Sequence, residues 1–293
     1  EIPECTAPYT APGLKSTQAL PEFYQGATAD YVKVDGKWVD GMAQDNMLTA
    51  LQNLQDAYTA GLIDQEAITN TTSACRDEWY AGTVGCFPYW GGLWGETLTV
   101  RLKQNVPDAE VIALPPIEGA TYLYSAPSVQ VISSKLSNEQ VASVFKYFIE
   151  YMHDGGEGQV LFQSGVEGVH WQQSGDNIDP LPTISKPAEL FRKAWITPWL
   201  ALTPMTATNR NVEVSQEVTD SLAVVSANAK NISVFPVSEQ RTMITSDLTT
   251  ARENIISRVA MGQLTPEEGM AEYKAQAETL NVAQALEEMN ANA

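Results

Sequence analysis

Aromatic residues gather around a glycine pair in the stretch TVGCFPYWGGLWGETL, residues 83–98. Tyr89 and Trp90 precede Gly91-Gly92, and Trp94 follows this pair. The cluster comes directly after an apolar run that is typical of a buried strand. Glycines permit tight turns and close approach to the backbone, so a ligand can reach a ring beside them. An aromatic face can stack on the apolar C–H face of a pyranose, and an indole N–H can donate a hydrogen bond to a hydroxyl group. For any single tryptophan, a core position remains the alternative.

A second cluster of polar and aromatic side chains lies in residues 165–171, GVEGVHW. Glu167, His170 and Trp171 place a carboxylate, an imidazole and an indole within one glycine-rich turn. Carboxylate and imidazole groups form hydrogen bonds with hydroxyl groups, and the indole offers another stacking face. Tryptophans beside glycines in both clusters together indicate a binding site rather than independent core side chains.

Other arrangements of reactive side chains are weaker. Cys86, with His153 or His170 as its base, would need a thiolate, but Cys86 lies in an apolar run, where a thiol is usually inert. A Cys75–Cys86 disulfide stays open, because sequence spacing does not define the Cβ geometry. The two histidines have no cysteine or acid at the spacing of zinc ligands, so we expect no metal and no cofactor. Asp35-Gly36-Lys37 lacks the acidic ladder of a calcium loop and predicts a turn between short strands.

Paired carboxylates are the most serious enzymatic alternative. Glu96 beside Trp94 and Glu167 beside Trp171 could supply the two acids of a glycoside hydrolase, with aromatic platforms for the substrate. The sequence does not show whether two carboxylates face each other, so this alternative stays open, as does a sugar-binding module for sensing or adhesion. We expect a binding protein rather than an enzyme.

Composition and charge restrict the class of partner. The 293 residues are 44% apolar and 18% charged, as in globular proteins. Lys and Arg number 17 against 36 Asp and Glu, and the formal net charge of −19 would repel nucleic acid and anionic membranes. This charge suits a neutral ligand better than an acidic one, although Arg101, Arg192 or Arg210 could still hold an acidic ligand. No apolar run is long enough to span a bilayer. The chain opens without an initiator Met or an apolar leader, which predicts a processed chain or a part of a longer one, and we expect a monomer.

Hydrophobic periodicity predicts helices in three regions. The first spans residues 45–61, between an aspartate N-cap and a glycine stop. The second spans residues 137–156, with a capping-box pair at its start and glycines at its end. The third is the C-terminal part, with a helix over residues 247–261 and another that begins at Thr265-Pro266.

Short apolar runs bounded by turn residues suit strands of a covered sheet, and they lie at residues 84–87, 111–114 and 129–132. Proline-rich stretches predict loops at residues 180–187 and 198–204. The fold class is therefore α/β, with a mixed sheet flanked by helices and a helical C-terminal tail. We divide the chain into an irregular lead-in over residues 1–30, an α/β ligand-binding lobe over 31–135, and crossing segments and helices over 136–293.

Six short motifs, in order along the chain, resemble the extracellular solute-binding proteins of the family 1 type that serve bacterial ABC carbohydrate importers. They are DGKW at residues 35–38, YTAGLIDQE at 58–66, GTVGCFPYW at 82–90, LPPIEG at 114–119, GVEGVHW at 165–171, and IISRVAMG with LTPEE between 255 and 268. Each motif alone is weak, but their shared order covers most of the chain.

The resemblance implies a type II periplasmic-binding-protein fold, in which two α/β lobes close on a sugar by a hinge motion. It also implies a lipoprotein, attached at the cell surface by a lipid anchor outside this chain, and a membrane permease that receives the ligand. Proteins of this family are longer, so the resemblance implies a C-terminal portion that lacks the N-terminal lobe. Cys5 follows no apolar leader and is not interpreted as the lipid anchor.

The same resemblance places both aromatic clusters in the sugar-binding cleft. It implies two walls, formed by Trp90 and Trp94 and by Glu167, His170 and Trp171. We expect the tryptophans to stack on a mono- or oligosaccharide, and the acid and the imidazole to bind its hydroxyl groups. Tyr89 and Tyr124 are further ligand-binding candidates.

Overall fold

The computed structural model describes residues 5–15, 19–90, 93–114, 122–124, 131–175, 177–181, 215–231 and 234–293. The chain divides into two compact units: unit 1 joins Glu1–Ser125 to Val214–Ala293, and unit 2 is Ala126–Glu213. Unit 1 therefore contains both chain ends, and unit 2 is an insertion between its two parts. The division expected from the sequence, into residues 1–30, 31–135 and 136–293, stays a prediction.

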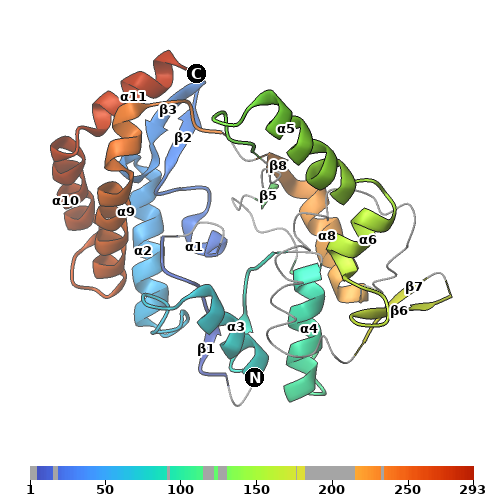
Figure 1. Ribbon diagram of the computed structural model, residues 1–293. Helices are drawn as coiled ribbons and strands as arrows, with labels where there is room; N and C mark the ends of the chain where they lie inside the picture. The colour runs from blue at the N-terminus through green and yellow to red at the C-terminus, as the bar shows by residue number, and fades with distance from the viewer. Residues whose placement is uncertain are drawn as a thin grey trace. The chain divides into compact units, whose positions relative to one another are not determined.

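Unit 1 begins with short strands and helices that alternate along the chain (Figure 1). In chain order they are β1 (Ala7–Tyr9), α1 (Pro21–Tyr24), β2 (Tyr31–Val34), β3 (Lys37–Asp40), the 3-10 turn η1 (Gly41–Ala43), α2 (Asn46–Thr59), α3 (Thr72–Ala81), β4 (Val84–Cys86), α4 (Leu93–Asn105) and β5 (Tyr122–Tyr124). After unit 2 the chain returns with α8 (Gln216–Asn228), β8 (Ala229–Asn231), α9 (Glu239–Ala260), α10 (Pro266–Thr279) and α11 (Val282–Ala291).

The described strands of unit 1 form two-stranded pairs rather than one broad sheet. β1 lies parallel to β4, and β5 lies parallel to β8. Tyr9 of β1 also forms a parallel bridge with Ile63, so three segments run side by side there. β2 and β3 form an antiparallel hairpin, whose turn has positive φ at Asp35 and Gly36. Positive φ at both central residues is the geometry of a tight hairpin turn, which confirms the turn expected at DGK.

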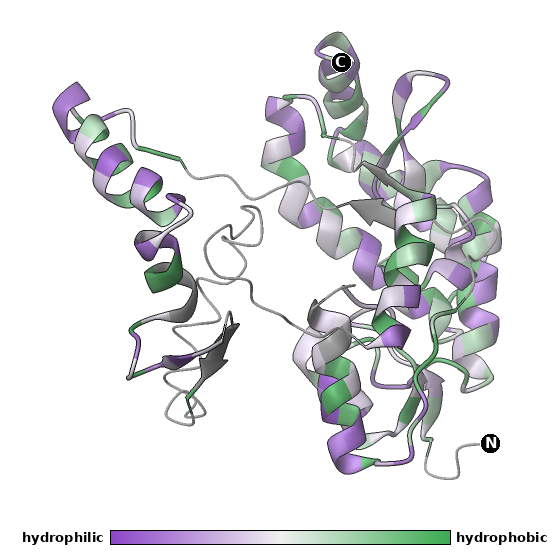
Figure 2. Cartoon of the chain, turned by 90° about the vertical axis from the view of Figure 1, so that its right-hand side faces the viewer, coloured by the Kyte–Doolittle hydropathy of each residue, from purple (hydrophilic) through white to green (hydrophobic). Residues whose placement is uncertain are grey.

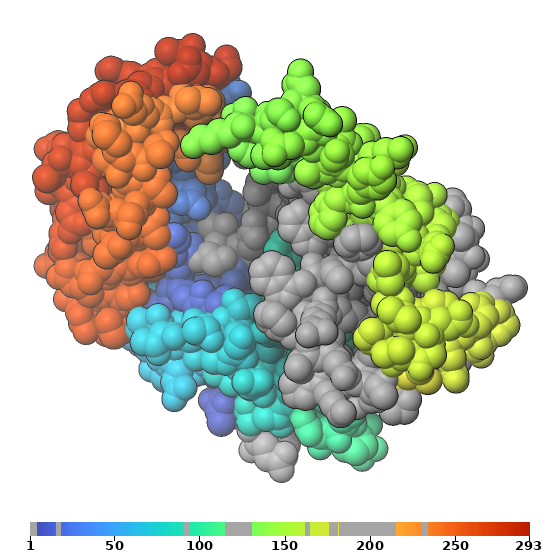
Figure 3. Space-filling view, viewed as in Figure 1, coloured from blue at the N-terminus to red at the C-terminus, as the bar shows by residue number. Residues whose placement is uncertain are grey.

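The hydrophobic core of unit 1 joins its N-terminal and C-terminal segments. Helix α2 packs against α9 and α10, and α9 packs against α11. Figure 3 shows α9, α10 and α11, in orange to red, forming one continuous surface over this side of the unit. Fully buried side chains come from both segments: Leu20, Met42, Met47, Leu51, Leu54, Ile63, Leu248, Ile255 and Ile256.

Unit 2 contains a long helical segment followed by a hairpin. Its described elements are α5 (Asn138–Val144), the π-helical turn η2 (Phe145–Glu150), α6 (Glu157–Ser164), and the antiparallel pair β6 (Trp171–Ser174) and β7 (Asn177–Pro180). In Figure 2, hydrophilic and hydrophobic residues alternate along these helices. The apolar side chains of the first helical segment are partly exposed; for example, Phe145 is 54% and Phe148 is 48% exposed.

The three helical regions expected from the sequence are confirmed, but the N-cap expected at Asp45 is wrong, because its side chain accepts no hydrogen bond from the first turn of α2. The other two predicted helix starts have local caps. Ser137 and Gln140 form the capping box of α5, and Thr265 and Glu268 form that of α10. Helix α9 begins earlier than expected, at Glu239, because the Ser238 hydroxyl accepts a hydrogen bond from the Arg241 amide and caps the helix there.

The strand predictions fare less well. Residues 84–86 form β4 as expected, but residues 111–114 form no strand and instead line a cavity. Residues 131–132 are irregular, and 129–130 lie outside the described residues. The expected irregular lead-in contains β1 and α1. Strand partners are distant in sequence, so a single apolar run does not reveal whether a partner exists. Most of the predicted loop at 180–187 and all of the one at 198–204 lie outside the described residues.

Candidate functional site

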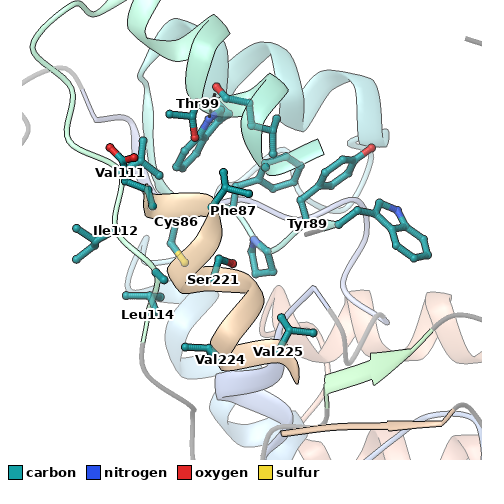
Figure 4. Close-up of a pocket in the computed structure, with 18 of the residues that line it drawn as sticks. Cys86, Phe87, Tyr89, Thr99, Val111, Ile112, Leu114, Ser221, Val224 and Val225 are labelled. Atoms are coloured by element: carbon teal, nitrogen blue, oxygen red, sulfur yellow. Dashed lines mark hydrogen bonds between the residues drawn. The ribbon is translucent and has the colours of Figure 1, made fainter. Parts of the chain in front are cut away.

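A cavity of about 440 Å³ opens in unit 1 at the carboxyl end of β4 (Figure 4). Helices α4 and α8, the residues that follow β4, and the segment 110–114 surround it. Its lining is mainly aromatic and aliphatic, with a few hydroxyl and carboxylate groups. A mostly apolar cavity of this size with few polar groups has the character of a small-molecule site.

Aromatic rings form one wall of the cavity and pack on one another. Phe87 and Tyr89 are stacked with ring centroids 5.0 Å apart, and the Trp79 ring centroid lies 6.4 Å from that of Phe87. The Trp79 indole N–H donates a hydrogen bond to the Leu98 carbonyl oxygen at 3.3 Å. These contacts fix the orientation of the rings before any ligand is present, which lowers the entropic cost of binding.

Tyr89 and Trp90 both line the cavity, whereas Trp94 lies outside the lining and supports Tyr89. The Trp94 ring meets Tyr89 edge to face at 5.5 Å, and the Arg76 guanidinium lies 5.1 Å from the Trp94 ring centroid. Trp90 is 58% exposed, a large exposed fraction for an indole. Trp90 is therefore the ring most available to a ligand, and Trp94 holds Tyr89 in place.

Aliphatic side chains form the other wall. Val218, Ser221, Val224 and Val225 lie on one face of α8, because residues three and four apart share a helix face. The adjacent segment adds Val111, Ile112 and Leu114, which Figure 4 shows beside that helix. Ile112 is 75% and Leu114 is 47% exposed, so this apolar surface is accessible to a ligand.

Polar groups in the lining are few and mostly acidic. Thr99 and Ser221 offer hydroxyl groups, and Glu22, Glu110 and Glu217 offer carboxylates. A hydrogen bond from its own backbone amide and one from Lys103, 3.1 Å away, lower the pKa of Glu217. Hydroxyl and carboxylate oxygens together can accept hydrogen bonds from a polyhydroxylated ligand.

Cys86 lines the same cavity, and its thiol is free. Burial, followed by the Glu22 carboxylate, raises the pKa of Cys86 to about 11. The thiol is therefore protonated at neutral pH, which does not suit a nucleophile. Cys75 is also free, so the disulfide left open from the sequence is absent.

The second predicted cluster lies in unit 2, in the loop between α6 and β6 and at the first residue of β6. The His170 Nδ1 accepts a hydrogen bond from the Val166 amide at 2.9 Å, and the Trp171 indole N–H donates one to the Gly165 carbonyl at 2.9 Å. Trp171 is 8% exposed, whereas Glu167 is exposed. The His170 and Trp171 side chains thus bind backbone groups of their own loop, whereas the Glu167 carboxylate faces solvent.

Gly165 is required by this loop geometry. Its φ is +81°, and a Cβ at this position would lie 2.7 Å from the His170 Nδ1. Only glycine combines this backbone conformation with so close a ring. Of the remaining candidates, Tyr124 lies in β5 opposite Asn231, but its side chain is outside the described residues, as is that of Glu96.

Sequence reasoning missed the aliphatic wall of the cavity. Residues 111–114 carried an apolar signal, which we assigned to a strand. Helix α8 carried an apolar stripe at helical spacing, which would have identified an amphipathic helix but not its position beside β4. The structure brings these segments to the aromatic wall, although α8 follows it by more than a hundred positions in the sequence.

Within the described part of the chain, no group of His, Cys, Asp or Glu side chains could hold a metal ion. In that same part, no helix has both the length and the apolar character needed to cross a bilayer.

No family model and no curated protein sequence matches the chain. Among solved structures, it is similar to the alginate-binding protein AlgQ2 without calcium, with a TM-score of 0.66 and 16% identity over 99% of this chain and 64% of that protein. It is similar to an HMO-binding, ABC-transporter-associated solute-binding protein from Bifidobacterium longum infantis, with a TM-score of 0.56 and 13% identity over 99% of this chain and 60% of that protein. A third similar structure is the S. pneumoniae ABC-transporter substrate-binding protein FusA, an EF-hand mutant in complex with fructo-nystose. The TM-score is 0.54, with 16% identity over 96% of this chain and 62% of that protein.

This chain spans between 60% and 64% of the length of these three proteins. All three are described as binding proteins rather than enzymes. At such low identity the similarity concerns the fold, not the ligand. The chain has the periplasmic-binding-protein fold, a helix-rich α/β architecture that ends in a helical tail.

Proposed function

We propose that this chain belongs to the solute-binding component of an ABC carbohydrate importer and binds a mono- or oligosaccharide in the cavity of unit 1. The observation that carries this proposal is the aromatic wall at the carboxyl end of β4. Tyr89 and Trp90 line the same cavity as the valines of α8, so a ring placed there contacts apolar surface from both elements.

A pyranose matches the chemistry of this cavity. Its C–H faces are apolar and its rim carries hydroxyl groups, so it gains from aromatic stacking and from a few oxygen acceptors at the edge. Thr99, Ser221 and Glu110 supply such oxygens. The cavity of about 440 Å³ falls within the range of about 300–1,000 Å³ that is usual for small-molecule sites.

The fold supports the same class of ligand. The names of the similar structures include alginate, HMO and fructo-nystose, which are all saccharides. By this similarity, we propose that the protein acts as a monomer outside the cell, held by a lipid anchor outside this chain, and delivers the sugar to a membrane permease.

The loop of unit 2 is proposed as a second source of ligand contacts. Glu167 is exposed and free to bind hydroxyl groups, whereas the hydrogen bonds of His170 and Trp171 hold its loop. We therefore assign the polar contact to Glu167 and a positioning role to the imidazole and the indole. Tyr124 stays a proposed ligand-binding residue. Trp94 stays one too, because it is 41% exposed although it lies outside the lining of this cavity.

The test is a titration with a panel of oligosaccharides, in which calorimetry and tryptophan fluorescence measure binding. Trp90→Ala should weaken binding of any saccharide that the chain binds by about tenfold or more, because it removes the exposed stacking face. Tyr147→Ala is the matched control, because Tyr147 is also exposed, at 71%, and lies in η2, outside the lining of the cavity and outside the loop that carries Glu167. It should bind like the wild type.

Two results would contradict the proposal: the absence of binding to every saccharide of the panel, or equal affinities of Trp90→Ala and the wild type. Chromatography of the recovered saccharide distinguishes binding from hydrolysis, since a binding protein returns its ligand intact.

A further inference from the structure

The charged side chains that line the cavity of unit 1 have one sign. Glu22, Glu110 and Glu217 contribute carboxylates, and among the described residues no lysine, arginine or histidine lines the cavity. Lys103 compensates Glu217 from outside, through an ion pair of 3.1 Å. Two carboxylates, those of Glu22 and Glu110, have no ion-pair partner in the described part of the chain.

The Glu22 carboxylate already accepts a hydrogen bond from within the protein. The Tyr9 hydroxyl donates a hydrogen bond to the Glu22 Oε2 at 2.6 Å. Burial, followed by this hydrogen bond, raises the pKa of Tyr9, so the phenol keeps its proton and remains committed to Glu22. It is therefore not available to neutralise or bind an anionic ligand.

The cations of the neighbouring helices α3 and α4 are also engaged. Arg76 stacks over Trp94 and donates a hydrogen bond to the Ser73 hydroxyl at 3.0 Å. Arg101 lies 5.3 Å from the ring centroid of Tyr80. A ligand carboxylate in the cavity would thus meet acidic groups, and no cation of the described residues is left to balance them.

We infer that the cavity selects uncharged saccharides and rejects those that carry carboxylates, such as uronic-acid oligomers. This inference rests on the proposed function, because it concerns the ligand of the same site. The apolar walls and the oxygen acceptors suit a neutral sugar, and the two uncompensated carboxylates exclude its acidic counterpart.

The size of the discrimination follows from the repulsion between two like charges. At about 4 Å this repulsion weakens binding by about fivefold in bulk water, and by about a thousandfold at the effective dielectric constant of a protein surface. The cavity is partly open, so we expect a preference of at least about tenfold for the neutral sugar.

The experiment compares matched pairs of probes on the intact chain by calorimetry: mannotriose with trimannuronate, and galactotriose with trigalacturonate. It repeats the comparison with Glu110→Gln, which removes one exposed carboxylate of the lining. Glu278→Gln is the charge-matched control, because Glu278 is exposed on α10 and does not line the cavity. Glu110→Gln should reduce the ratio of neutral to acidic affinity, and Glu278→Gln should leave that ratio unchanged.

The outcomes separate this inference from the proposed function. Binding of an acidic trimer as tightly as its neutral partner overturns the inference and leaves the proposed function intact. A ratio that changes equally in both variants also overturns it, since the effect would then come from net charge. If neither trimer of either pair binds, and a broader panel of saccharides also fails, the proposed function itself is wrong.

Discussion

Removal of the Arg252 side chain tests the buried ion-pair network that holds unit 1 together. Arg252 on α9 is 3% exposed and donates hydrogen bonds to Asp40 at 2.7 Å and to the Tyr273 hydroxyl at 3.1 Å. The Tyr273 hydroxyl donates to the other oxygen of Asp40 at 2.6 Å. Strand β3 therefore meets the consecutive helices α9 and α10, whose residues follow Asp40 by 212 and 233 positions, in one network.

The magnitude follows from the burial of Asp40, which is 5% exposed. Arg252→Ala leaves this carboxylate without its cation, and a broken buried pair costs about 3–5 kcal/mol. Burial lowers the pKa of Arg252, but the Asp40 carboxylate and Tyr273 raise it above its usual value, so the guanidinium stays charged. Tyr273→Phe removes only hydrogen bonds and should cost about 1–3 kcal/mol.

The control is Arg258→Ala on the same helix. Arg258 also reaches α10, where it pairs with Glu272 at 2.6 Å, but both side chains are about one third exposed, at 32% and 34%. An exposed pair contributes about 0–1 kcal/mol. Urea unfolding, followed by circular dichroism and tryptophan fluorescence, measures all three variants. Equal losses for Arg252→Ala and Arg258→Ala would refute the argument from burial.

Three further predictions concern pH, reactivity and packing. Burial, and then the nearby Asp64, raise the pKa of Glu78 above 4.5. The contribution of Glu78 to stability is therefore present below pH 4.5 and is lost as the pH rises through the raised pKa. Glu78→Gln should flatten this part of a curve of unfolding free energy against pH. Cys86 should react slowly with iodoacetamide at pH 7 and faster towards its pKa of about 11, and a bound saccharide should protect it, as peptide mass spectrometry can show. Gly41→Ala would place its Cβ against the carbonyl oxygens of Thr28 and Asp30, and should lower the free energy of unfolding by about 1–3 kcal/mol in the same urea assay.

Helices with local capping signals were predictable from the sequence. Ser137 and Thr265 begin capping boxes whose donors and acceptors lie within three residues, so no distant contact is needed to place these helix starts. The hairpin at Asp35-Gly36 is local for the same reason. The start of α9 was missed because its polar first turns, beginning at Glu239, carry little apolar periodicity.

The site was predictable only in part. Tyr89 and Trp90 were identified from aromatic residues beside glycines, and the structure places both in the cavity lining. Their role in binding a ligand stays a prediction, as do the roles of Glu167, His170 and Trp171. The aliphatic wall was not predictable, because α8 is brought beside β4 by contacts that no local pattern encodes.

The sequence by itself determined the helix boundaries at strong caps, the acidic charge, and the aromatic residues available for stacking, since these depend on residue type and short spacing. Only the tertiary structure decided which side chains share a cavity. It brought Trp94 into contact with Tyr89 and showed that residues 111–114, predicted as a strand, line the cavity. It also placed Cys86 near Glu22, where its thiol stays protonated. These decisions depend on contacts between segments far apart in the chain, whose free energy does not appear in any local stretch of sequence.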